Sequence, residues 1–191
     1  MPIRAARSSN GSPTTRSSRW PGTDWIEDLV LRQSGADVYD QWVANEVKFT
    51  DAPIKDAFDS LGEILLNPDY VNAGFGDVKS INSTAFADVA APLANGTCAM
   101  THQASFLSAN LLTVETADGA TPEIAPEGDV YAFILPGVKE GEVSIEGGGE
   151  FVTVFSDNEA TQKVAEFMST PEFADARVKL GGVISANNGA D

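Results

Sequence analysis

Three short stretches of this 191-residue sequence combine side chains that could bind a small polar molecule. Residues 20–25 read WPGTDW, where two indole rings flank a predicted turn that carries a hydroxyl and a carboxylate. Residues 101–106 read THQASF, a polar patch ending in an aromatic ring, and residues 147–150 read GGGE, where glycines let backbone amides approach a ligand. Such groups suit a sugar, because its C–H groups stack on aromatic faces while its hydroxyls form hydrogen bonds at the rim.

The candidate binding residues all come from these three stretches. They offer an aromatic face, a polar side chain or a glycine backbone: Trp20, Asp24, His102, Gln103, Phe106, Gly148, Gly149 and Glu150. Packing explains Trp20, His102 and Phe106 about as well as ligand contact does, whereas Trp25 and Trp42 are expected to pack in the core. The 101–106 stretch follows a predicted strand, and ligands of α/β sheets bind at the carboxyl ends of strands.

Signatures of catalysis are few. The single histidine excludes a metal site built from several histidines, and the single cysteine, Cys98, is expected to have a structural role. The sequence contains neither a G-x-S-x-G nucleophile motif nor a phosphate-binding P-loop. We therefore expect no catalytic activity, no cofactor and no metal. A sugar hydrolase that uses Asp24 and Glu150 as its pair of carboxyl groups stays open as an alternative.

The charge is strongly acidic and unevenly distributed. The chain has 28 acidic and 12 basic residues, a net charge of −16, yet residues 1–19 contain four arginines and no acidic residue. Nucleic acid is excluded as a partner because phosphate binding needs clustered basic side chains. No apolar run approaches the ~20 residues of a membrane span. An acidic protein-interaction module is a second alternative function.

Hydrophobic spacing predicts an α/β domain over residues 20–191, preceded by a disordered basic tail at 1–19. The tail has too little apolar surface to offset the entropy of ordering, and it lacks the apolar stretch of a secretory signal. Predicted helices alternate with predicted strands in the rest of the chain. The helices are expected at 51–66, 83–94, 104–112, 158–169 and 171–180, and the strands at 97–101, 130–135 and 151–155.

Four blocks of the sequence resemble the extracellular solute-binding proteins of family 1. They are WPGTDWIEDLVLR at 20–32, GADVYDQWVANEVKFTDAPIKDAFDSLGEIL at 35–65, CAMTHQASFLSANL at 98–111 and GGGEFVTVFSDNEATQKVAEFMSTPEF at 147–173. These proteins are the sugar-binding components of ABC importers, and the blocks are most similar to the alpha-glucoside or oligosaccharide type.

The resemblance implies a type II periplasmic-binding-protein fold, in which two α/β lobes close on a sugar. It implies that Trp20 lies in the cleft and that Phe106 stands where many members have an aromatic platform, usually Trp. His102 and Gln103 would line the same loop, and the turn at 148–150 would correspond to a glycine loop near the hinge. The role of Asp24 as a hydroxyl acceptor is our inference from its chemistry.

The implied protein is a monomer with two partners, a sugar or oligosaccharide ligand and the ABC permease subunits in the membrane. Its implied location is the periplasm or the cell surface. Because members of the family are longer, the chain is expected to be a fragment without the first lobe and without part of the second. We expect its sugar affinity to be weak or absent for the same reason.

Overall fold

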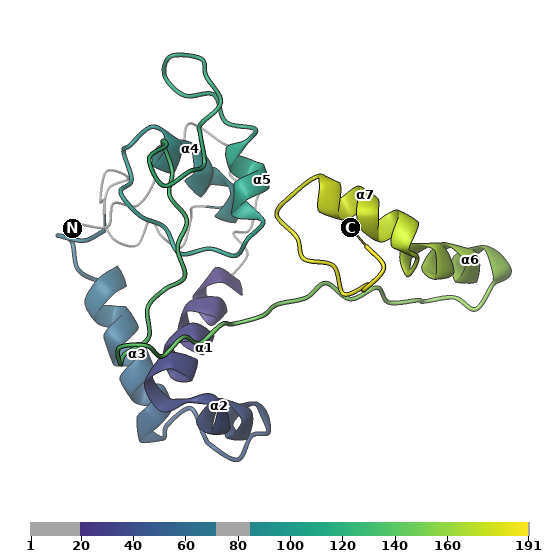
Figure 1. Cartoon of the computed structure of the whole chain (residues 1–191). Helices are drawn as coiled ribbons and strands as arrows, with labels where there is room; N and C mark the ends of the chain where they lie inside the picture. Colours follow the sequence, from purple (N-terminus) through teal and green to yellow (C-terminus); the bar gives the residue numbers. More distant parts are fainter. Residues whose placement is uncertain (1–19, 72–84, 191) are drawn as a thin grey trace.

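A computed structural model describes residues 20–71 and 85–190 of the chain. The predicted tail at 1–19 and the start of the predicted helix 83–94 lie outside the described residues. In the two described ranges, three groups of elements follow one another along the chain (Figure 1).

The first group consists of three helices, α1 (Trp20–Ser34), α2 (Ala36–Val43) and α3 (Ala52–Leu65). Gly35, with a φ of 83°, allows the sharp change of direction between α1 and α2. Pro53 lies in the first turn of α3, where its missing N–H costs no helical hydrogen bond. Helix α1 contacts both of the others (Figure 1). Helix α3 confirms the helix predicted at 51–66.

The apolar faces of α1 and α3 form the larger core. Helical spacing places one apolar residue above another on each helix, which gives each a continuous face to bury. The buried residues are Ile26, Val30, Ile54 and Ala57, and the partly buried ones packed against them are Leu29, Tyr39, Trp42, Val47 and Leu61. The expected packing role of Trp42 is confirmed. Trp25 is only half-buried and lies outside this cluster.

The second group surrounds a smaller core. A 3-10 helix at Phe86–Val89 continues into α4 (Ala90–Ala94), and α5 (Leu107–Leu111) packs beside α4. The buried residues Ala90, Leu111 and Val130 join these helices to the irregular segment that follows α5. These helices lie within the ranges predicted at 83–94 and 104–112, but they are shorter.

The third group is a helical pair, α6 (Glu159–Met168) and α7 (Pro171–Lys179), which Figure 1 shows at the end of a long extended segment. Asn158 caps α6 by accepting a hydrogen bond from the backbone N–H of Thr161, so the helix begins one residue later than the predicted range 158–169. Thr170 caps α7 in the same way and Pro171 begins it, as predicted.

The strands predicted at 97–101, 130–135 and 151–155 are wrong. The structure shows these three stretches as irregular segments, apart from the bridge residue Val130. The β-type pairing within 20–71 and 85–190 is one isolated bridge between Ile124 and Val130. A strand needs a neighbouring strand to satisfy its backbone groups, and Phe151 and Phe155 stay 91% and 95% exposed. The α/β class is therefore not confirmed by the structure.

The turn predicted at residues 20–25 is also wrong, because these residues form the first turns of α1. The Thr23 hydroxyl donates a hydrogen bond of 2.7 Å to the Trp20 carbonyl.

Helices long and apolar enough to cross a membrane are absent from the described ranges.

Candidate functional site

Three aromatic rings meet where the start of α1 faces the second group of elements. The ring centroids of Trp20 and Phe106 lie 5.7 Å apart, and Phe86 completes the cluster at 5.3 Å from Trp20 and 5.6 Å from Phe106. The rings are tilted or edge-to-face, an arrangement that aromatic quadrupoles favour. Trp20 and Phe106 are half-buried and Phe86 is exposed. The structure thus brings two candidate residues together although they are 86 positions apart in the sequence.

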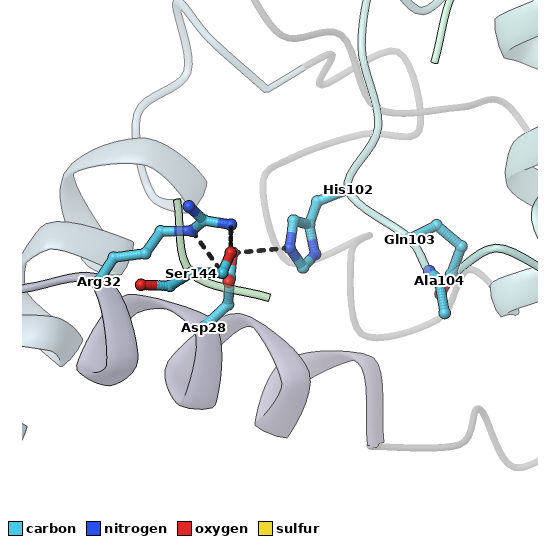
Figure 2. Close-up of polar contacts among 6 residues, drawn as sticks. All are labelled: Asp28, Arg32, His102, Gln103, Ala104 and Ser144. Carbon is cyan, nitrogen blue, oxygen red and sulfur yellow. Dashed lines mark hydrogen bonds and ion pairs between the residues drawn. The ribbon is translucent and has the colours of Figure 1, made fainter. Parts of the chain in front are cut away.

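His102 contacts α1 further along the helix, at Trp25 and Asp28. Its ring stacks on Trp25 with a centroid distance of 4.2 Å and an interplanar angle of 28°. Its Nε2 is 3.2 Å from a carboxylate oxygen of Asp28 (Figure 2). The imidazole keeps 23% of its surface exposed, so one edge can reach a ligand.

Asp28 is the buried centre of the polar contacts. Its side chain is 4% exposed, and its Oδ1 accepts a hydrogen bond of 2.9 Å from Nε of Arg32, one turn later on α1. Arg32 also donates from Nη2 to the carbonyl oxygen of Ser144 at 2.9 Å. Asp28 and Arg32 therefore join α1 to two distant segments, those around His102 and around Ser144 (Figure 2).

Further carboxyl groups surround Asp28. Burial, with a smaller contribution from Glu27, raises the pKa of Asp24, and the nearby His102 opposes this increase. Burial also raises the pKa of Glu146 to about 8, and three carboxylates of α1 add to the increase, those of Asp24, Glu27 and Asp28. The site therefore offers groups that can accept hydrogen bonds from hydroxyls and, where a carboxyl is protonated, donate one.

Tyr39 extends the polar contacts toward α2. Its hydroxyl donates a hydrogen bond of 2.6 Å to Oε2 of Glu27, and this bond is the main cause that raises the pKa of Tyr39 to about 12. Tyr39 also packs against the larger core. The contact ties the orientation of Glu27 to the packing of the three-helix group.

The remaining candidates occupy different positions. Gln103 follows His102, and its Oε1 accepts a hydrogen bond from the backbone N–H of Ala104. Gly148 and Gly149 lie in the exposed segment that leads to α6, and Glu150 forms an ion pair of 3.3 Å with Arg177 of α7. The contacts recorded for the described residues do not join Gly148, Gly149 or Glu150 to the aromatic cluster.

Sequence reasoning missed three residues of this arrangement. Phe86 falls within the predicted helix 83–94, and nothing local distinguishes a packing phenylalanine from one beside a ligand. Asp28 and Arg32 carry a recognisable signal, because a carboxylate and a guanidinium four residues apart on a helix can pair. Their burial could not be foreseen, since it depends on segments more than 70 residues away.

The chain belongs to the bacterial extracellular solute-binding proteins, whose family profile matches residues 2–175. The resemblance seen in the sequence is thereby confirmed. The chain is 33% identical over 162 residues to the alpha-glucosides-binding periplasmic protein AglE of Rhizobium meliloti, covering 80% of this chain and 32% of the relative. It is 27% identical over 184 residues to the osmoprotective compounds-binding protein GgtB of Synechocystis, covering 95% of this chain and 41% of the relative.

The chain therefore spans about a third to two fifths of the length of these curated relatives. No solved structure matches it.

Proposed function

We propose that this chain is part of a carbohydrate-binding receptor that delivers its ligand to an ABC importer. The family profile and the two relatives support solute binding, and one relative is named for alpha-glucosides. The observation that carries the choice of a sugar is the cluster of Trp20, Phe86 and Phe106 beside the polar groups of Asp24 and His102. Sugars need this combination of aromatic faces and hydrogen-bonding side chains.

The mechanism we propose is capture of the sugar, closure of two lobes around it and transfer to permease subunits in the membrane. In this proposal the receptor is not an enzyme, acts as a monomer in the periplasm or at the cell surface, and adopts the two-lobed type II fold. The described residues would supply one wall of the binding cleft. Because the relatives are much longer, the chain alone is expected to bind sugar weakly, with a Kd on the order of 1 mM.

The test is a titration of the chain with maltose and trehalose, followed by calorimetry and by saturation-transfer NMR, which detects weak binding. We expect Phe106→Ala to abolish the signal because the substitution removes one ring of the cluster. The matched control is Phe155→Ala, which removes a phenylalanine that is 95% exposed in the extended segment. Equal loss in both variants, or no binding at several millimolar sugar, would contradict a sugar site at the cluster.

The same chain also allows tests of the two alternative functions, a sugar hydrolase and an acidic interaction module. Hydrolysis of an aryl glucoside that is lost in Asp24→Asn or Glu150→Gln would favour a hydrolase. Salt-sensitive binding to a basic partner that is unaffected by Phe106→Ala would favour an acidic interaction module. Micromolar affinity for maltose would refute the expectation of an incomplete cleft.

A further inference from the structure

We propose that Asp28 is a positioning residue of the sugar site. It holds His102 with a proton on Nε2, and it thereby presents Nδ1 as a hydrogen-bond acceptor to a donating hydroxyl of the sugar. The ligand half of this inference rests on the proposed function. The half that concerns the proton on His102 does not, and it can be tested without a ligand.

The position of the proton follows from the contacts of the buried carboxylate. Oδ1 of Asp28 is 2.9 Å from Nε of Arg32, and Oδ2 is 3.2 Å from Nε2 of His102. An ionised carboxylate can only accept hydrogen bonds, so both neighbours must donate. In neutral imidazole only one ring nitrogen carries a proton, and the nitrogen that donates to Asp28 is Nε2.

Nδ1 is then left as an acceptor without a proton. Among the residues that the structure describes, it has no hydrogen-bond partner, and Figure 2 shows Nε2 as the ring nitrogen that faces Asp28. The stack on Trp25 holds the plane of the ring, while 23% of the side chain stays exposed. The ring is therefore fixed at one nitrogen and open at the other.

The acceptor Nδ1 determines which chemical group of a ligand can bind to it. A lone acceptor nitrogen is satisfied by a group that donates a hydrogen bond, and a sugar hydroxyl can do so while the rest of the ring contacts aromatic faces. A sugar with an O-methyl group at that position cannot donate and is rejected. The aromatic cluster would thus bind the apolar face, and His102 would recognise one hydroxyl.

The proposal predicts a specific result for Asp28→Asn, because the side-chain amide has one oxygen that accepts and one NH₂ group that donates. Arg32 can only donate, so the amide oxygen must face Arg32 and the amide NH₂ must face His102. Nε2 then has to accept, and the proton moves to Nδ1. The ring keeps its place but presents the opposite hydrogen-bonding character to the ligand.

The experiment uses nitrogen NMR of chains labelled at histidine, and His102 is the only histidine, so every signal is assigned in advance. Spectra are recorded at about pH 9, above the range in which histidine side chains ordinarily titrate. In the native chain we expect the protonated nitrogen to be Nε2, and in Asp28→Asn we expect it to be Nδ1. The control Asp24→Asn removes a carboxyl of the same helix that lies near His102, and it should leave the proton on Nε2.

A proton on Nδ1 in the native chain, or a change in Asp24→Asn as large as in Asp28→Asn, would overturn the proposal. If Asp28→Asn fails to fold, the native spectrum alone decides, because the expected proton position is a property of the unaltered chain. Maltose is then added to the native chain, where the Nδ1 resonance should shift in the direction of an accepted hydrogen bond. In Asp28→Asn, where Nδ1 carries the proton, the same hydroxyl has to accept instead, so added maltose should shift the Nδ1 resonance in the direction of a donated hydrogen bond.

A failure of this proposal can be distinguished from a failure of the proposed function. Maltose that binds without moving the Nδ1 signal overturns the ligand half of this proposal and leaves the proposed function standing. A native Nε2–H proton with no maltose binding at all contradicts the proposed function and the ligand half together. In that case Asp28 still sets the protonation of the ring.

Discussion

The carboxyl group of Glu146 makes the stability of this chain depend on pH in a predictable direction. Its pKa is raised from 4.5 to about 8, chiefly by burial and also by the carboxylates of Asp24, Glu27 and Asp28. Between these two values the folded chain retains a proton that the unfolded chain has lost. The free energy of unfolding must therefore fall as the pH rises from 4.5 to 8. Glu146→Gln removes this dependence, because an amide stays neutral at every pH.

The size of the effect follows from the pKa change and from exposure. A change from 4.5 to about 8 corresponds to a ceiling of roughly 5 kcal/mol. Glu146 is only half-buried, so solvent screening reduces the contribution, and we expect about 1–2 kcal/mol. Glu146→Gln should accordingly be more stable than the native chain by about this amount at pH 8.5, and the two chains should be nearly equal near pH 4.5.

The assay is urea unfolding of both chains at several pH values between 4.5 and 8.5, with the difference between their free energies of unfolding as the measured quantity. Glu142→Gln is the matched control, because Glu142 belongs to the same segment but is exposed beside Lys139. This control should follow the native chain at every pH. Parallel curves for Glu146→Gln and the native chain, or a difference that grows toward acidic pH, would refute the reasoning.

Three further predictions concern side chains of the core and of the polar contacts. Arg32→Ala should lower the free energy of unfolding by about 3–5 kcal/mol in urea titrations, because it leaves the charge of Asp28 buried without its guanidinium partner. Ile54→Ala should cost about 2–5 kcal/mol in the same assay, since the Ile54 side chain is fully buried in the larger core. An ultraviolet titration should show one tyrosine that ionises at about pH 12, and that component should vanish in Tyr39→Phe, which removes the phenol bonded to Glu27. A late component that survives Tyr39→Phe would contradict the assignment.

The helices that sequence patterns predicted well are those with local signals at both ends. In α3 and α7 a proline in the first turn and regular apolar or capping residues suffice, because each contact lies within a few positions. The strand predicted at 151–155 had the right composition, but a strand depends on a partner that a local pattern cannot supply. The start of α1 shows the same limit, because the residues that suggested a turn at 20–25 are helical in the structure.

The candidate site likewise combines features that the sequence indicates with contacts that only the fold creates. Aromatic and polar residues identify which stretches could bind a sugar, and the structure places Trp20 and Phe106 in contact. The contact of Asp28 with His102 spans 74 positions, and no periodicity indicates it. Glu150 had the right chemistry for the site but pairs with Arg177 instead. Composition therefore selects candidate residues, while the contacts that each candidate makes depend on the tertiary fold.

The contact between Arg32 and Ser144 bridges 112 positions, and a contact of such long range bears on the order of folding. Helices α1, α2 and α3 pack through contacts between near neighbours in the chain, which close short loops at a small entropic cost. The contacts of Asp28 and Arg32 require long loops to close first, and contacts of this kind form late. We infer that the three helices fold early and that the polar centre around Asp28 is completed last.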